Sequence, residues 1–430
     1  THHAIRITHT SMFTATLSAR FPALASRNYR IFWIGQFASL IGTWMQNTVQ
    51  PYLAYRITGQ PVYLGLIGFA ASLPSLLLML PGGVLVERLD KRKTVIVMQT
   101  VLMAQAFTLA FLALTGTITV WHIAALSFVA GVANSVEITA RQAMMIELVG
   151  RPALPNAIAL NSAVFNLARV IGPSLTAPFL VLLGEQGEGW AFFANGVSFL
   201  FVIIGLLFVR TKPQSRASAA RASAVQEFRE GQRYIRSSAV VALLIVMAAI
   251  PGFFGFTAIQ QMPVFARDIF QQPGDTESIV AARNSALMTA QGIGALAAAV
   301  VLATFSAVKR KGALMTAGQF AFSAALVLIA FSRSLPAALP LMVIIGWGSV
   351  TQLAMTNTLV QLLVPNELRG RVISTYLWAL QGVAPFGSLF VGALAQQFGA
   401  PTAVLFGGGV CLLAVVAIHL KTPIIRQIVA

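Results

Sequence analysis

The feature that most constrains this chain is a succession of long apolar stretches, separated by short polar connections. A helix needs about 20 apolar residues to cross the roughly 30 Å hydrocarbon core of a bilayer. Because lipid offers no hydrogen-bond partner to an open backbone, such stretches must be helical. Twelve of them are recognisable, at 30–56, 62–86, 94–115, 119–141, 155–184, 189–209, 238–267, 280–308, 312–332, 337–363, 371–397 and 402–420.

The charge content agrees with a membrane protein. Only 10% of the residues are charged and 57% are hydrophobic, whereas soluble proteins carry about 25% charged residues. The net charge of +17 would suit a nucleic-acid partner, but the basic residues lie in short clusters between the apolar stretches, where they orient membrane helices. The stretches are also too long and continuous for the strands of a membrane barrel. We expect the lipid bilayer as a partner and no nucleic acid.

The polar segment 211–237 divides the predicted spans into six and six. Basic triplets at 91–93 and 309–311 recur about half the chain length apart, which favours two related halves. We predict an all-α membrane protein with twelve transmembrane helices in two pseudo-symmetric six-helix halves. The expected parts are an N-terminal cytoplasmic lead (1–29), a first bundle (30–210), a cytoplasmic linker (211–237), a second bundle (238–420) and a cytoplasmic tail (421–430).

The distribution of basic residues predicts the orientation. Of the 29 Lys and Arg residues, all but five flank the side that carries both termini and the linker. The exceptions are Arg56, Arg267, Arg283 and Arg333 on the opposite side, and Arg169 inside a span. Cytoplasmic loops are enriched in Lys and Arg. We therefore expect a multi-pass protein of the inner or plasma membrane with both termini in the cytoplasm.

The connection between the second and third spans reads GVLVERLDKRK at 83–93. It resembles the signature G-x-L-A-D-R-x-G-R-R/K of the major facilitator superfamily, with Glu87 in place of aspartate and Asp90 in place of the second glycine. The segments 27–46, 140–173 and 364–372 resemble the branch of that superfamily that contains the enterobactin exporter and macrolide efflux pumps. The resemblance covers most of the chain and implies a transporter of small molecules.

By that resemblance, the signature forms a latch between the two halves. Glu87 would face the positive end of the helix that starts near Arg369, and Lys91 would pair with Glu137, whose helix face also carries Arg141. The alternative is that these charges only mark the membrane boundary. The predicted latch residues are Gly83, Glu87, Arg88, Lys91, Arg92, Glu137, Arg141, Arg369 and Arg371.

The resemblance also implies a central cavity lined by the first, fourth, seventh and tenth spans. Amides in these spans need partners, so each binds substrate or joins two helices. Arg169 is charged inside a span, which marks it as a functional candidate; it would bind an anionic group of a substrate or pair within the protein. The predicted cavity residues are Gln46, Asn47, Gln50, Asn134, Arg169, Gln260, Gln261, Gln352 and Asn357.

Two spans carry residues that permit bending. Gly172 and Pro173 resemble the core of an antiporter motif, although its closing glycines are absent, and Pro385 is a rough counterpart in the eleventh span. No carboxylate is expected at the midplane, so Glu137 is the best candidate for a proton carrier. Asp268, at the end of the seventh span, is expected to be a solvated end charge.

These observations predict a secondary active transporter, not an enzyme. We expect proton-driven efflux of a small hydrophobic or amphipathic compound of the drug or siderophore class, by a monomer with the proton gradient as its energy source and no cofactor or metal. An importer of the same fold is the alternative. A polytopic membrane enzyme is disfavoured, because the sequence shows no catalytic His/Asp cluster, no dinucleotide fingerprint and no phosphate-binding loop.

Overall fold

The computed structural model describes the backbone at 21–209, 224–304 and 310–422, and the side chains there except at 79–88, 185 and 224–228. All the secondary-structure elements among the described residues are helices and none is a strand, so the all-α prediction is confirmed. The elements are α2 (Pro22–Ala25), α3 (Arg27–Thr58), α4 (Val62–Arg88), α5 (Lys91–Leu114), α6 (Val120–Leu183), η1 (Gly184–Gln186), α7 (Gly187–Phe208), α8 (Ala224–Ser237), α9 (Ala239–Ile250), η2 (Pro251–Gly255), α10 (Phe256–Ile259), α11 (Met262–Val264), η3 (Phe265–Ile269), α12 (Glu277–Thr304), α13 (Lys311–Ile329), α14 (Leu335–Leu363), α15 (Asn366–Gln381), α16 (Ala384–Phe398) and α17 (Ala400–Lys421).

Each predicted span coincides with a helix or with a run of helical pieces. Nine stretches among the described residues are long and apolar enough to cross a membrane. One of them, α6, has 64 residues and non-helical angles at Gly150 (φ 73°, ψ 169°); unbroken, it would extend about 96 Å, so we count it as two spans. Counting α6 twice and adding α3 and α4 gives the twelve spans that we assign.

Two of the spans are built from several pieces. The seventh comprises α9, η2, α10, α11 and η3, of which η2 and η3 are π-helical. The eleventh comprises α15 and α16, which are separated just before Pro385.

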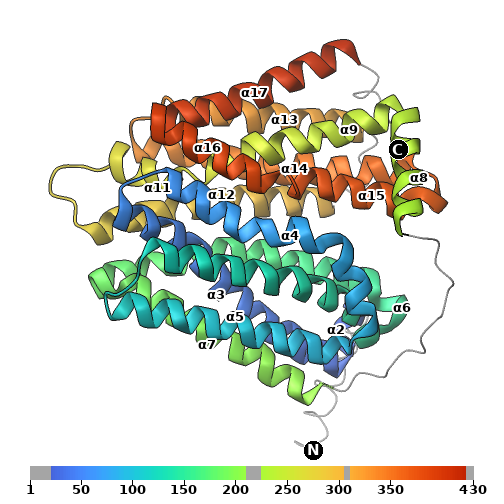
Figure 1. Ribbon diagram of the computed structural model, residues 1–430, viewed down its shortest axis with the longest axis horizontal. Helices are drawn as coiled ribbons and strands as arrows, with labels where there is room; N and C mark the ends of the chain where they lie inside the picture. The colour runs from blue at the N-terminus through green and yellow to red at the C-terminus, as the bar shows by residue number, and fades with distance from the viewer. Residues whose placement is uncertain (1–20, 210–223, 305–309, 423–430) are drawn as a thin grey trace, which may run out of the picture.

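The helices gather into two bundles, which Figure 1 shows below (blue to green) and above (yellow to red). In the first bundle α3 packs on α6 and α7, and α5 on α6 and α7; in the second, α14 packs on α12 and α13, and α17 on α13 and α16. The bundles meet through α4 against α16 and α6 against α12. The core of each bundle is apolar and mostly aliphatic, as expected where packing and not water expulsion holds helices together.

Helix α8 marks one end of the molecule, at the right in Figure 1, where the described chain also begins and ends. It lies against α15: Glu230 forms an ion pair with Arg371, and Gln232 Nε2 donates to Thr375 Oγ1 at 3.2 Å. We call this the α8 end and the opposite one, at the left, the α11 end. The predicted linker thus contains a helix that is docked on the second bundle.

Candidate functional site: a cleft between two bundles

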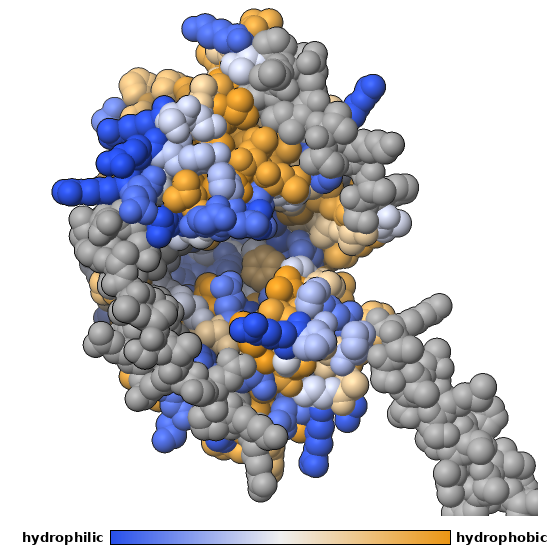
Figure 2. Space-filling view, turned by 90° about the vertical axis from the view of Figure 1, so that its right-hand side faces the viewer, coloured by the Kyte–Doolittle hydropathy of each residue, from blue (hydrophilic) through white to orange (hydrophobic). Residues whose placement is uncertain are grey.

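A cleft opens between the bundles at the α8 end. Figure 2 looks onto this end and shows a hollow between the upper and lower parts, with both hydrophilic and hydrophobic residues on its walls. The ion pairs that the structure describes near this end, Lys91–Glu147, Glu137–Arg141 and Glu230–Arg371, each stay on one side of the cleft. Within the described residues, no ion pair therefore ties the bundles together here.

The α11 end is closed by polar contacts between the bundles. Tyr55 of α3 donates a short hydrogen bond to Asp268 of η3, and the Tyr52 hydroxyl lies 3.4 Å from Glu277 Oε2. Arg267 holds Glu277 in place through two hydrogen bonds of 2.7 and 2.9 Å. Both tyrosines are buried, at 1% and 3% exposure. We call these five residues the tyrosine–carboxylate gate.

Sequence reasoning missed this gate. Asp268 was expected to be a solvated end charge, whereas the structure bonds it to the opposite bundle. The signal that could have revealed it is a pair of tyrosines three residues apart at the end of an apolar helix. Such hydroxyls need partners when buried, and the acids that follow the seventh span are the nearest candidates.

Small residues bring the bundles into backbone contact toward the α11 end. A Cβ atom added to Gly392 of α16 would lie 2.8 Å from Cα of Gly65 in α4. A Cβ added to Gly292 of α12 would lie 2.5 Å from the carbonyl oxygen of Arg169 in α6. Neither position has room for a side chain, which is how small residues act between membrane helices. These contacts close both flanks of the cleft.

Inside the first bundle, amides line a polar cavity of about 130 Å³. It includes all four amides that the sequence predicted there: Gln46, Asn47, Gln50 and Asn134. Gln46 Nε2 donates to Gln50 Oε1 at 3.0 Å and to Gln105 Oε1 at 3.2 Å, while Asn195 Nδ2 donates to Gln46 Oε1 at 2.7 Å. Gln50 Nε2 donates to Ser127 Oγ at 2.5 Å. Sequence reasoning did not foresee the contributions of α5 and α7 to this network.

The size of this cavity limits what it can hold. Ligand sites for drug-sized molecules occupy about 300–1,000 Å³, well above 130 Å³. Several of the buried amides bond to one another, although Gln105 Nε2 has no partner among the described residues. Asn47 is exposed and Asn134 partly exposed. The cavity therefore suits several waters or one polar group of a ligand whose remainder lies in the cleft.

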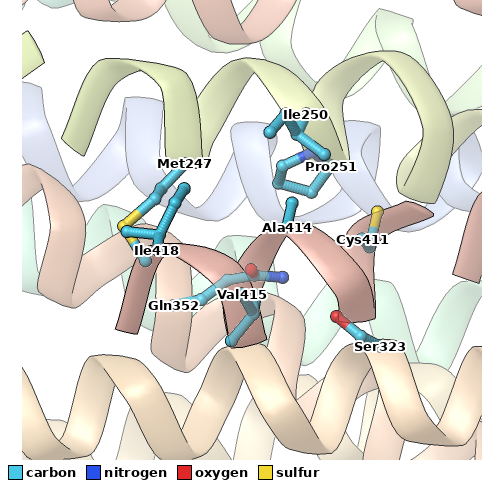
Figure 3. Close-up of a pocket in the computed structure, with 9 residues that line it drawn as sticks. All are labelled: Met247, Ile250, Pro251, Ser323, Gln352, Cys411, Ala414, Val415 and Ile418. Atoms are coloured by element: carbon cyan, nitrogen blue, oxygen red, sulfur yellow. The ribbon is translucent and has the colours of Figure 1, made fainter. Parts of the chain in front are cut away.

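The predicted amides of the second bundle do not gather in the same way. Gln352 lies in a separate cavity of about 10 Å³ with Ser323 and Cys411 (Figure 3), enough for one water. Gln261 is fully buried, and the side-chain amide oxygen of Gln260, Oε1, lies against α4 at Gly68.

This finding corrects the prediction that Gln260, Gln261 and Gln352 line a central cavity in this conformation. Gln260 and Gln261 were assigned to the wrong face because the seventh span contains two π-helical segments. These segments break the 3.6-residue periodicity from which helix faces are assigned. Asn357 is partly exposed, and its Oδ1 accepts a 2.6 Å hydrogen bond from Gln361 Nε2.

Glu137 is the centre of a buried polar cluster in the first bundle. It is 3% exposed, and Arg141 Nε donates to its two carboxylate oxygens at 3.0 and 3.3 Å. Gln99 Nε2 donates to the same carboxylate at 3.1 Å, and Arg141 Nη1 donates to Asn161 Oδ1 at 3.1 Å. This arrangement places a buried carboxylate directly beside its counter-charge and gives it three hydrogen bonds.

The predicted pairing of Lys91 with Glu137 is wrong. Lys91 Nζ instead lies 2.5 Å from Glu147 Oε1. Lys91 begins α5 at the end of the bundle, and Glu137 lies ten residues deeper along α6 than Glu147. Ten residues of helix correspond to about 15 Å, beyond the reach of a lysine side chain.

The other predicted latch residues divide between the bundles. Arg92 donates to the carbonyls of Leu206 and Leu207, at 2.7 and 3.0 Å, and so caps the end of α7. Arg371 pairs with Glu230 of α8. Arg369 is partly buried, and its Nε has no hydrogen-bond partner among the described residues. The side chains of Gly83, Glu87 and Arg88 lie outside the described residues.

Arg169 stacks on an aromatic ring. Its guanidinium carbon lies 5.4 Å from the ring centre of Trp44 in α3. A Cβ added to Gly172 would lie 2.5 Å from Trp44 Cβ, so this glycine lets α6 approach α3 closely. Pro173 is buried in a stretch of α6 that keeps helical angles; the departure in this helix is at Gly150. Pro385 lies at the start of α16, where the eleventh span is interrupted.

Comparisons with known proteins agree with this geometry. The chain is 24% identical to the multidrug efflux pump Tap of Mycolicibacterium fortuitum over 88% of its own length and 91% of the relative. It is also 24% identical to the staphyloferrin A transporter of Staphylococcus aureus, over 86% of this chain and 90% of that one.

Solved structures share the fold. A mutant of the nucleoside transporter NupG superposes with a TM-score of 0.70 at 12% identity, covering 91% of this chain and 98% of that one. An inward-facing bacterial homologue of the human lysosomal transporter Spinster gives 0.67 at 16% identity, covering 94% and 96%. The sequence pattern of the major facilitator family described as transmembrane secretion effector matches residues 18–427. The chain therefore belongs to this family of membrane transporters within the major facilitator superfamily.

Proposed function

We propose that this transporter exports a small hydrophobic or amphipathic compound from the cytoplasm, driven by the proton gradient, through alternating access of one cleft. The observation that carries the proposal is the asymmetry of the cleft, which is open at the α8 end and closed at the α11 end by contacts between the bundles. Transporters with two related halves bind substrate between them and rock one half against the other. Relatives named as a multidrug efflux pump and a staphyloferrin A transporter support the substrate range.

The orientation follows from the basic residues. The described chain begins and ends near the α8 end, and basic residues such as Lys91, Arg92 and Arg371 lie there, so we assign this end to the cytoplasm, with the protein in the plasma membrane. The structure then represents a state open to the cytoplasm. We assign the halves to 30–210 and 238–420, which rock as units within a monomer, with α8 moving on the second half through Glu230 and Arg371.

Glu137 is our proposed proton carrier. It is buried beside Arg141, and the amide-lined cavity, which includes Asn134 of α6 and Gln105 of α5, lies toward the α11 end of the same bundle. Protonation would neutralise the carboxylate and release Arg141, which then changes its bonds to Glu137 and Asn161. Coupling between this event and the polar cavity would let a proton and a substrate exchange.

Inverted membrane vesicles with an acidic interior test the function. An exported compound should restore the fluorescence of a pH-quenched dye, because each cycle exchanges an internal proton for external compound. Glu137→Gln should abolish this response but still exchange labelled for unlabelled compound, since a neutral side chain cannot release a proton. Glu147→Gln is the matched control, because it removes a paired carboxylate at the bundle end.

Two results would contradict the proposal. Full proton-coupled transport by Glu137→Gln would exclude Glu137 as the carrier. A response confined to vesicles of native orientation, with an acidic exterior, would mean that proton and compound move together into the cell, which is the importer alternative.

A further inference from the structure

We infer that the transported compound is an anion, and that Arg169 stacked on Trp44 binds its negative group. This inference rests on the proposed transport function and specifies the substrate class. Three observations carry it: the balance of charge inside the membrane, the lack of a counter-charge at Arg169, and the polar face of α6 that leads to it.

The first observation is the charge balance. In the interiors of the described spans, away from their ends, the charged side chains are Glu137, Arg141 and Arg169. Glu137 and Arg141 neutralise each other at 3.0 Å, which leaves one positive charge. Among the described side chains of the span interiors, a cationic compound in the cleft would meet a like charge and no unpaired carboxylate. Charges attract or repel strongly where little water screens them, so the cleft favours anions.

The second observation is that Arg169 lacks a counter-charge. Among the residues that the structure describes, it forms no ion pair or hydrogen bond through its side chain, and its Nε is buried without a partner. Among the described residues, its guanidinium carbon lies over the Trp44 ring, 5.4 Å from the ring centre. A charge within a membrane span is costly and marks a function by default. The N–H groups of the Arg169 guanidinium are therefore available to an anionic group.

The third observation is the face on which Arg169 lies. Ser162, Asn166 and Arg169 are spaced four and three residues apart, on one side of α6. Ser162 is exposed, and Asn166 and Arg169 are partly exposed. Polar side chains of membrane helices face protein or water-filled cavities. These side chains lie on one face of α6 between the α8 end and Arg169, and we place this face in the cleft.

The chemistry of the site defines the ligand further. A guanidinium whose face is stacked on an aromatic ring still presents its N–H groups at its edge, and these match the two oxygens of a carboxylate. Asn47 lies one helical turn beyond Trp44 on α3 and opens into the amide-lined cavity. The arrangement fits a small carboxylate with further hydroxyl, amide or carbonyl groups.

The test compares ligands of similar size whose head groups differ in charge. Naphthoate, naphthamide and naphthylmethylammonium share one ring system and carry negative, zero and positive charge; citrate is added as a polar carboxylate. Each is tested for its effect on the melting temperature of the purified full-length protein, and in the vesicle assay. The variants are Arg169→Gln, Arg169→Lys and, as a matched control, Arg283→Gln, which removes an arginine that pairs with Asp275 outside the cleft.

The expected result is stabilisation and transport of the carboxylates only. Arg169→Gln should weaken carboxylate binding at least about tenfold, as for loss of a charge-assisted hydrogen bond. Arg169→Lys should restore part of the affinity, and Arg283→Gln should match the wild type. Carboxylates that stabilise the wild type but not Arg169→Gln, without any transport, would support the site while refuting the proposed function.

Three results would overturn the inference. One is preferential binding or transport of the ammonium or the amide. Another is equal stabilisation of the wild type and Arg169→Gln by carboxylates. The third is that no carboxylate binds at all.

Discussion

Removing one hydroxyl of the tyrosine–carboxylate gate should open the α11 end. In the closed state, Tyr55 donates to the Asp268 carboxylate from a buried position; in the open state both groups would be hydrated. A hydrogen bond to a charged group contributes about 1.5–3 kcal/mol, so Tyr55→Phe should shift the equilibrium toward the open state by about 10- to 150-fold. A ratio of closed to open molecules of about 99 to 1 would become about 91 to 9, or shift further toward the open state.

Spin labels can measure this shift. Gln60 and Gln271 are exposed at the α11 end on opposite bundles and can carry introduced cysteines. The single native cysteine, Cys411, is buried and is replaced to remove background labelling. In Tyr55→Phe, the distance distribution between the labels should gain a longer component.

The control is Tyr29→Phe, which removes a buried hydroxyl that donates to the Ala157 carbonyl at 3.0 Å within the first bundle. It should lower stability without changing the label distances. The reasoning is refuted if Tyr55→Phe leaves the distribution unchanged, or if Tyr29→Phe changes it equally.

Three further predictions concern packing, the polar network and pH. Gly392→Ala would place a methyl group 2.8 Å from Gly65 Cα, so the same spin labels should report more of the open state; an unchanged distribution would mean that the helices shift without cost. Asn195→Leu leaves Gln46 Oε1 without its 2.7 Å donor and should cost about 1–3 kcal/mol, seen as a lower melting temperature in detergent. In the turn before α12, the Arg283 guanidinium and a backbone N–H hold the pKa of Asp275 below its usual value. The ion pair therefore contributes its full share of stability above a pH of about 4 and loses it only as the pH falls through the lowered pKa. Arg283→Gln should thus change the melting temperature by the same amount at pH 5 and at pH 7, and a clear difference between the two would contradict the assignment.

The helices and the family could be predicted because both depend on local sequence. A span is recognised by its own residues, and the motif at 83–93 is continuous in the chain. The amides of the first bundle were also predicted to share a cavity, and regular helices do bring Gln46, Gln50 and Asn134 together.

Contacts between helices could not be predicted in the same way. The partner of Lys91 depends on depth along a neighbouring helix, and the partner of Tyr55 depends on how two bundles meet. Neither quantity is local in sequence. The seventh span adds π-helical turns that composition does not signal, so the positions of Gln260 and Gln261 were misjudged.

The backbone contacts at Gly65, Gly292 and Gly392 have a consequence for speed. Side chains that interlock across an interface must leave their neighbours' grooves before two bodies can move, and that step raises an activation barrier. Smooth backbone surfaces have no such step and can separate or slide directly. At these glycines the two bundles can therefore slide or separate without unlocking side chains, which favours rapid turnover and gives the hydrogen bonds at the α11 end a larger share in the lifetime of the closed state.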